Sequence, residues 1–380
     1  MLQGVAGWIY RREPRIAPVR DALNPNLERH LRQDPWQSLH FAFPQEENLE
    51  ARWQLWQEAQ VVIPEPLPAF YAYSQAFYGP TFRQQWGLIG LLPASASILP
   101  HEGTLPGRVQ ELAERFRRFP LQTTPIQLFV DLPTAPVEGL IREYLSCPLF
   151  SVSGEEGVTH RWTPIHHYGH QAQLRRWLGT GPFLLADGHH RWAALRMAGL
   201  AYILVYIIPL GNASPLLAPI HRLLRGVDEV FLEAIEPYFS VQRSRSRLPL
   251  WQEVQGIRYS LGLVSPRGES FLAKLRPALW AEAEAEPLSA CFHRWVLSRL
   301  AEAVVEYSRE PAYIVESAMR GAGWGVIFPP FSFSYVRRAA AQQRLLPPKT
   351  TYFYPKVVSG LCFYYEGDFG LRFAAPARAS

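Results

Sequence analysis

The stretch that decides the fold of this chain is FLLADGHHRW at residues 183–192, followed by AALRMAGL at 193–200. An apolar run, an Asp-Gly turn and a helical pattern predict a strand, a sharp turn and a helix. The first N–H groups of a helix lack partners inside it and carry a partial positive charge, so they attract anions. We therefore expect a phosphate to contact Gly188, His189, His190 and Arg191, whose guanidinium suits phosphate oxygens. The alternative for Asp187 is that it only caps the helix.

The composition indicates a globular, mildly basic protein. The chain has 380 residues, more than a typical single domain, with 48% hydrophobic and 19% charged residues. Its net charge of +5 comes from scattered arginines and lysines and not from a basic block, which weighs against nucleic-acid binding. The three cysteines lie far apart, which fits a reducing compartment. Without a signal sequence or an apolar run near membrane-span length, we expect a cytoplasmic protein with no membrane partner.

Periodicity and turn signals outline the expected elements along the chain. Asn24-Pro25 predicts a helix start within a largely helical segment up to residue 60. The other expected elements are a hairpin of 70–73 and 86–92, a helix at 108–119, strands at 126–130 and 202–208, a hairpin of 257–264 and 270–275, a helix at 289–307, a strand at 325–328, a helix at 335–343 and two late strands. This pattern predicts an α/β (α+β) fold.

A second cluster is His101-Glu102-Gly103-Thr104. A glutamate beside a histidine can act as a general base, and its carboxylate can bind Mg²⁺. The alternative is ordinary pairing of Glu102 with the positive end of a helix.

A third cluster is Leu346-Pro347-Pro348-Lys349-Thr350-Thr351-Tyr352-Phe353-Tyr354-Pro355-Lys356. Its lysines are suited to phosphate or carboxylate as point charges. The alternative is a surface loop that leads into an edge strand.

The histidines at 160, 166, 167, 170, 189 and 190 invite a metal interpretation. His166 and His170 would share one helix face as a ligand pair. Because no carboxylate or cysteine completes the set at a recognisable spacing, we favour solvent-exposed or helix-capping roles.

These motifs carry a family resemblance. Ala186–Arg191 matches the hallmark Ala-Asp-Gly-His-His-Arg of a bacterial and archaeal family called domain of unknown function 1015, and His101, Glu102 and Thr104 match its His-Glu-x-Thr. Pro347–Lys356 matches its C-terminal Pro-Pro-Lys-Ser/Thr-Thr-Tyr-Phe-x-Pro-Lys. The family also carries an N-terminal Pro-Tyr-Asp element. Here Pro18-Val19-Arg20-Asp21 keeps the aspartate and lacks the tyrosine, which leaves the tyrosine's role in doubt.

A second resemblance suggests a ligand. Asp187–Arg191 is similar to the phosphate-binding box of the ParB/sulfiredoxin superfamily, which includes nucleotide-hydrolysing partition proteins and an archaeal free-serine kinase. The resemblance implies a mixed-sheet ParB/sulfiredoxin-like core that binds ATP, ADP or CTP. Sulfiredoxin has a reactive cysteine in this box. His189 stands in its place here, which argues against sulfinic-acid repair.

Together these observations predict a ParB-like nucleotide-binding domain at 1–225 and a smaller α+β domain at 226–380. The expected activity is Mg²⁺-dependent phosphoryl transfer or nucleotide hydrolysis on a small polar substrate, and the alternative is a non-catalytic nucleotide or ligand sensor. The resemblance implies catalytic roles for Glu102, His101 and Asp187, with Mg²⁺ on Glu102 and Asp187. It also implies that Gly188, His189, His190, Arg191 and Thr104 contact the nucleotide. Site closure is expected from Asp21, Lys349, Thr350, Tyr352 and Lys356, the lysines approaching from the second domain.

Overall fold

The chain forms two compact units in the computed structural model, which describes residues 1–20, 23–79, 81–154, 157–178, 181–211, 215–227 and 230–368. Unit 1 comprises residues 1–100 and 104–214 and the segment from Pro355 onward. Unit 2 comprises residues 101–103 and 215–354. The units differ from the predicted division after residue 225, because residues 215–225 belong to unit 2 and the C-terminal segment returns to unit 1.

Unit 1 is built on a mixed sheet, which in the described residues has eight strands in the order β5-β10-β7-β11-β4-β3-β9-β8. The strands are β3 (Phe70–Tyr78), β4 (Phe82–Pro93), β5 (Ile98–Leu99), β7 (Ile126–Val130), β8 (Phe150–Ser153), β9 (Thr159–Ile165), β10 (Phe183–Asp187) and β11 (Tyr202–Pro209). β7 pairs parallel with β11 and antiparallel with β10. The predicted hairpin is confirmed as β3 and β4, which pair from Tyr71–Ile89 to Tyr78–Phe82.

The two faces of this sheet differ in chemistry. One face carries apolar side chains such as Leu128, Ile207 and Leu88, which share a core with apolar residues of four helices. These helices are α4 (Pro106–Arg118), α5 (Ala135–Ser146), α6 (Tyr168–Leu178) and α7 (His189–Ala198). On the opposite face, the register places Asp187 beside Gln127 and Gln127 beside Tyr206. We call this second face the polar face.

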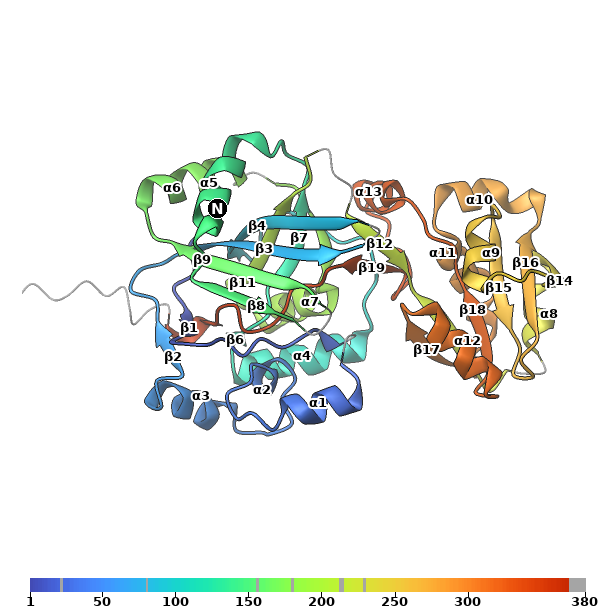
Figure 1. Ribbon diagram of the computed structural model, residues 1–380, viewed down its shortest axis with the longest axis horizontal. Helices are drawn as coiled ribbons and strands as arrows, with labels where there is room; N and C mark the ends of the chain where they lie inside the picture. The colour runs from blue at the N-terminus through green and yellow to red at the C-terminus, as the bar shows by residue number, and fades with distance from the viewer. Residues whose placement is uncertain are drawn as a thin grey trace, which may run out of the picture. The chain divides into compact units, whose positions relative to one another are not determined.

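The N-terminal segment forms α1 (Pro25–Leu31), α2 (Leu39–Ala42) and α3 (Leu49–Glu58). These three helices, drawn in blue, lie below the sheet of unit 1, as does the turquoise α4 (Figure 1). The predicted start of α1 is confirmed: the Asn24 side chain accepts hydrogen bonds from the backbone N–H groups of Asn26 (3.0 Å) and Leu27 (2.9 Å). Short strand pairs join β1 (Trp8–Tyr10) to β2 (Val62–Pro64) and β6 (Leu121–Gln122) to β20 (Tyr364–Tyr365). The 3₁₀ turn Glu366–Asp368 follows β20.

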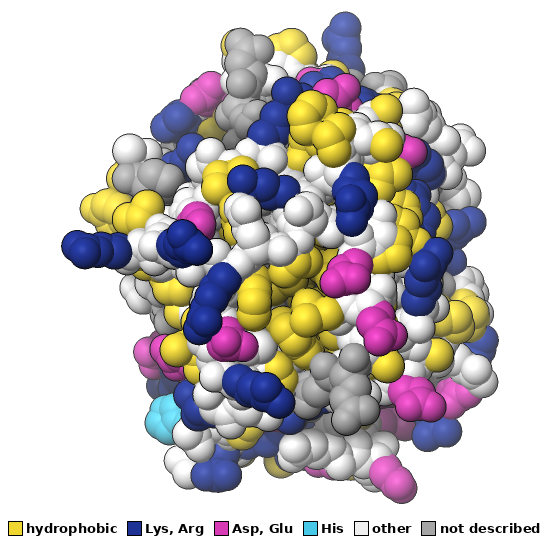
Figure 2. Space-filling view, turned by 90° about the vertical axis from the view of Figure 1, so that its right-hand side faces the viewer, with side chains coloured by type: hydrophobic (Ala, Val, Ile, Leu, Met, Phe, Trp, Pro, Cys, Tyr) yellow, Lys and Arg dark blue, Asp and Glu magenta, His cyan; other side chains and the backbone are white. Residues whose placement is uncertain are grey.

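Unit 2 contains an antiparallel sheet, which in the described residues has six strands in the order β14-β16-β15-β18-β13-β17. The strands are β13 (His221–Arg225), β14 (Phe239–Arg243), β15 (Ser260–Val264), β16 (Ser270–Leu275), β17 (Val304–Ser308) and β18 (Trp324–Ile327). A separate pair joins β12 (Leu216–Pro219) to β19 (Thr351–Tyr354). The side of unit 2 that carries β14 and β16 shows hydrophobic side chains gathered in the middle of charged ones (Figure 2).

The helices of unit 2 confirm the predicted mixture of helix and strand, with one error. They are α8 (Phe231–Ile235), α9 (Leu250–Gln255), α10 (Trp280–Ala285), α11 (Leu288–Trp295), α12 (Pro311–Met319) and α13 (Phe333–Ala341), with 3₁₀ turns at Pro277–Leu279 and Leu297–Arg299. The predicted helix at 289–307 is wrong beyond Trp295, because Val304–Ser308 pairs with β13 as an edge strand. β-Branched valines favour such a strand once a partner is present.

The mixed α/β fold class, with a second and smaller sheet region, is therefore confirmed. In the described part of the chain, no helix is both long and apolar enough to cross a membrane.

Candidate functional site

The start of α7 has the geometry that the sequence predicts. β10 ends at Asp187, Gly188 is the N-cap residue, and α7 begins at His189. Gly188 has a φ of +94°, and a Cβ there would lie 3.1 Å from Arg191 Nη2 and 3.2 Å from Ile126. Only glycine adopts this conformation readily. Since glycine offers no side-chain cap, the positive end of α7 has no oxygen from its N-cap side chain.

Asp187 lies between two cationic side chains of unit 1. One carboxylate oxygen accepts from Arg191 Nη2 at 3.1 Å, and the other is bound by Lys356 Nζ. The side chains of Asp187, Arg191 and Lys356 are 18%, 20% and 7% exposed, so water screens the group little. Burial alone raises the pKa of Asp187, but the charges of Lys356 and Arg191 outweigh it and hold that pKa well below its usual range. Asp187 is therefore ionised at neutral pH.

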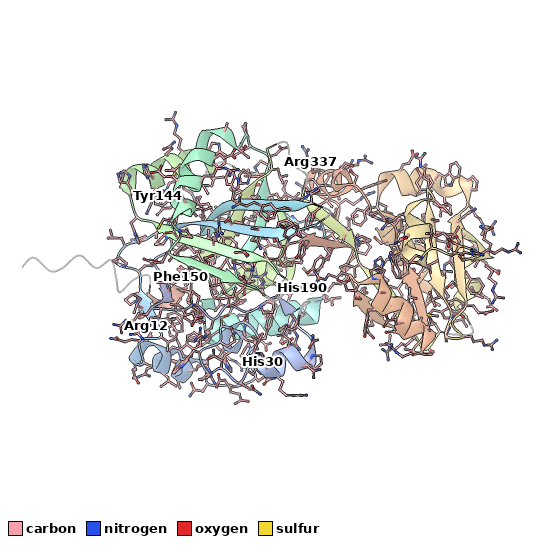
Figure 3. All side chains as sticks on the ribbon, viewed as in Figure 1. Arg12, His30, Tyr144, Phe150, His190 and Arg337 are labelled. Atoms are coloured by element: carbon pink, nitrogen blue, oxygen red, sulfur yellow. The ribbon has the colours of Figure 1, made fainter. Side chains whose placement is uncertain are left out.

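Arg191 and His190 also contact neighbouring segments. Arg191 Nη1 donates to the carbonyls of Thr124 (2.5 Å) and Pro125 (3.1 Å), the residues that precede β7. His190 Nε2 accepts from the backbone N–H of Leu105 at 3.0 Å, and Leu105 is the N-cap of α4 (Figure 3). His189 is buried. Arg191 and His190, two of the predicted phosphate ligands, therefore hold α7 against neighbouring segments. Thr104, another predicted ligand, lies in unit 1 just before α4.

The polar face extends from Asp187 across several strands. Gln75 Nε2 donates to the carbonyl of Lys356 at 2.8 Å, and His160 Nδ1 lies 2.7 Å from the Tyr73 hydroxyl. Burial lowers the pKa of His160 to about 4, so its imidazole is neutral at pH 7. A cavity of about 50 Å³ is lined by His160 and Lys356 together with Ile16, Pro18, Val19, Ser153, Gly154, Val158 and Val358. That volume suits one or two water molecules.

Sequence reasoning missed most of the polar face. Gln127 offered a signal, because it is a polar residue in the apolar strand Ile126–Val130. Its side-chain oxygen is buried and has no hydrogen-bond partner among the described residues. Gln75 and His160 carried no comparable pattern, since only strand pairing brings them beside Lys356.

Glu102 contacts the part of the C-terminal motif that lies in unit 2, residues 347–354. Glu102 accepts from the backbone N–H groups of Lys349 (2.7 Å), Thr350 (3.1 Å) and Thr351 (3.0 Å). The Thr351 hydroxyl donates to the same carboxylate at 2.9 Å, and His101 Nε2 lies 2.9 Å from that hydroxyl. Burial raises the pKa of Glu102, and the donors from Lys349 and Thr351 oppose that shift. The carboxylate thus fixes the turn that leads into β19.

The structure divides the predicted site residues between the units. Asp187, Gly188, His189, His190 and Arg191 lie in unit 1 with Lys356. His101 and Glu102 lie in unit 2 with Lys349, Thr350 and Tyr352, whose hydroxyl accepts from Arg309 Nη1 at 3.0 Å. Lys356 was expected from the second domain; it lies in unit 1, because the chain returns there from Pro355 onward. Asp21 lies outside the described residues.

The histidine pair proposed from sequence does not share a helix. α6 begins at Tyr168, after His166, whose Nε2 lies 2.9 Å from Glu65. His170 Nδ1 lies 2.9 Å from the Tyr144 hydroxyl, and His167 Nδ1 accepts from the His170 N–H, which is a capping role. Within the described ranges, no three histidine, cysteine, aspartate or glutamate side chains gather as metal ligands would.

Unit 1 also has an open groove along α4, with a volume of about 840 Å³. Its lining alternates arginine and glutamate, and several of these are paired, such as Arg32 with Glu28 (2.6 Å) and Arg108 with Glu111 (2.6 Å). None of the residues that line the groove belongs to the segment 186–191.

The chain is similar to one protein family and to several solved structures. The model of the family described as protein of unknown function (DUF1015) matches residues 15–290. No curated protein matches the sequence. Among solved structures, a conserved hypothetical protein from Pyrococcus furiosus is 14% identical with a TM-score of 0.45, covering 73% of this chain and 95% of its own. A free serine kinase in complex with AMP is 15% identical with a TM-score of 0.43, covering 71% and 90%. SbnI with a C-terminal truncation from Staphylococcus aureus is 12% identical with a TM-score of 0.43, covering 71% and 85%.

Proposed function

This chain belongs to the family described as protein of unknown function (DUF1015), whose description assigns no activity, and we propose its function from the geometry of unit 1. The proposal is that the start of α7 binds the phosphate of a nucleotide. The observation that carries the proposal is the trio of Asp187, Arg191 and Lys356, at most 20% exposed, beside the Gly188 N-cap.

The electrostatics of this place favour an anion. One carboxylate and two cations leave the trio with a net charge of +1. The dipole of α7 adds partial positive charge at the same end. Gly188 leaves its backbone open to close approach, and His189 and His190 are further candidates for phosphate contact. ATP, ADP and CTP are the nucleotides to test.

The finer proposal is Mg²⁺-dependent phosphoryl transfer or hydrolysis on a small polar substrate, with Glu102, His101 and Asp187 in the catalytic roles. Phosphoryl transfer depends mainly on positioning and charge neutralisation. The residues as placed do not fit a Mg²⁺ site, since Asp187 is already bound by two cations and Glu102 accepts four hydrogen bonds. We therefore derive no step through the metal.

A nucleotide sensor is the second candidate. The full set of donors on Glu102 favours it, because a carboxylate that holds a turn is less available to take a proton. Both candidates require binding, but only the enzyme requires Glu102 for turnover.

The first experiment is a thermal-shift panel of ATP, ADP, CTP and GTP with and without Mg²⁺. A ligand at 100 times its Kd stabilises the native state by about 2.7 kcal/mol, which is readily measured as a rise in Tm. If no nucleotide shifts the Tm of folded protein, the proposed function is wrong.

A matched pair of variants locates the binding. Gly188→Asp and Gly188→Asn impose the same strain at the +94° φ and differ by one negative charge. We expect Gly188→Asp to bind nucleotide at least about tenfold more weakly than Gly188→Asn, because the carboxylate repels the phosphate. Equal affinities would place the phosphate elsewhere.

Turnover distinguishes the two candidates. The wild type and Glu102→Gln are compared for phosphate release and for transfer to small hydroxyl-containing acceptors. An enzyme turns over in the wild type and loses that activity in the variant, whereas a sensor binds equally in both and turns over in neither.

A further inference from the structure

Unit 2 buries an arginine whose guanidinium is poorly satisfied: Tyr307 and the charge of Glu102 act on Arg222, but its N–H groups lack well-aligned acceptors in the described chain. Arg222 lies on β13, between Tyr307 of β17 and Val326 of β18, and its side chain is 0% exposed. In the part of the chain that the structure describes, its Nε, Nη1 and Nη2 make no well-aligned hydrogen bond. A guanidinium has five N–H donors, and burying a charge without a partner is costly. Such a group requires an explanation beyond packing.

Two aromatic rings flank this guanidinium. Its central carbon lies 4.7 Å from the centroid of Phe328 and 5.6 Å from that of Tyr307. The quadrupole of an aromatic ring attracts a cation placed over its face, and this attraction uses none of the cation's N–H donors. Burial lowers the pKa of Arg222 to about 10, while Tyr307 and Glu102 oppose that shift. The group is therefore charged at neutral pH.

Helix α11 supplies further polar atoms. Ser289 and His293 lie one turn apart on this helix, and Ser289 Oγ and His293 Nδ1 are buried without a hydrogen-bond partner in the described chain. Burial and the charge of Arg222 both lower the pKa of His293, so that ring is neutral and near the guanidinium. Residues i and i+4 share one helix face. These polar atoms interrupt a core that is otherwise formed by residues such as Phe292 and Phe328.

We propose that Arg222, with Ser289 and His293, binds the carboxylate of a small-molecule ligand inside unit 2. The guanidinium fork matches two carboxylate oxygens, and the flanking rings accommodate a planar group. The site is independent of the nucleotide site in unit 1, so either proposal can fail alone.

Formate, the smallest carboxylate, is the probe. Sodium formate is titrated against sodium chloride at equal ionic strength, following the Tm and the line width of ¹³C-formate. We expect formate to raise the Tm and to broaden its own resonance in the wild type, and chloride to do neither. Arg222→Met should lose both effects. Arg225→Met is the matched control, because Arg225 lies on the same strand but is exposed and paired with Glu306 at 2.6 Å.

Stability separates a ligand site from a structural arginine. In buffer free of carboxylates, Arg222→Met should be as stable as the wild type or more so, since it removes a buried charge whose N–H groups lack well-aligned acceptors. If that variant fails to fold, Ser289→Ala carries the test, with an expected loss of formate affinity of about threefold or more. A wild type that responds equally to formate and chloride, or an Arg222→Met that responds like the wild type, overturns the site. A larger response to sulfate, also lost in Arg222→Met, overturns the carboxylate assignment.

Discussion

Asp187 in unit 1 is a partly buried carboxylate and Glu102 in unit 2 a buried one, and different partners hold them. The side-chain charges of Lys356 and Arg191 bind Asp187, whereas three backbone N–H groups and one hydroxyl bind Glu102. Two cations overcome burial and lower the pKa of Asp187. The neutral donors and the charge of Lys349 together do not overcome burial at Glu102, and the pKa of Glu102 stays raised. The comparison shows that motif residues far apart in sequence hold one another in place, whatever chemistry they also perform.

The largest expected effect is at Lys356. Lys356→Met leaves Asp187 with one cation in a place where its charge is poorly solvated, so we expect unit 1 to lose about 3–5 kcal/mol of unfolding free energy. Chemical unfolding measures the loss. Lys274→Met, at an exposed lysine, is the control and should change little. In the double variant with Asp187→Asn, the loss should be smaller than the sum of the single losses. Additive losses would show that the two side chains do not interact.

A smaller effect is expected at Glu102. Glu102→Gln retains an acceptor oxygen but turns an amide N–H₂ group toward the donors of residues 349–351. We expect a loss of about 2 kcal/mol in unit 2, together with faster hydrogen exchange of those three amides. Glu302→Gln, at an exposed glutamate, is the control. Unchanged exchange at residues 349–351 would contradict the structural role.

The smallest expected effect is on pH dependence, and its sign differs between the two carboxylates. The lowered pKa of Asp187 means that its stabilisation is present above its ordinary value of 3.8 and is lost as the pH falls further. The raised pKa of Glu102 means that its contribution is greatest below 4.5 and is lost as the pH rises through the raised value.

Urea midpoints measured across the acid range test both signs. Relative to Asp187→Asn, the wild type should lose stability on acidification. Relative to Glu102→Gln, it should lose stability as the pH rises. If the urea midpoints of the wild type and of its variant change with pH in parallel, the pKa of that carboxylate does not affect stability.

Local signals predicted much of the fold. The Asn24 cap, the β3–β4 hairpin, the strand Ile126–Val130 and the turn at Gly188 are short-range features, and each was found where the residues indicated. The error at 304–308 has the opposite origin, because that segment is a strand only by pairing with β13.

The sequence predicted which residues the candidate site contains, but not which of them lie together in the fold. Asp187, Gly188 and Arg191 are close in sequence, so a turn and a helix start suffice to gather them. Lys356 reaches Asp187 across 169 positions, and no local pattern encodes that pairing. Gln75, Gln127 and His160 share the polar face only through strand register.

The sequence by itself determined the family, the mixed α/β class and the glycine-capped start of α7, because turn chemistry and helix capping act over a few residues. Only the tertiary structure decided that Lys356 binds Asp187, that Glu102 holds the turn before β19, and that Arg222 is buried without a well-aligned hydrogen bond among the described residues. The physical reason is that burial and long-range pairing set the cost of a charge, and both depend on which distant segments the fold brings together.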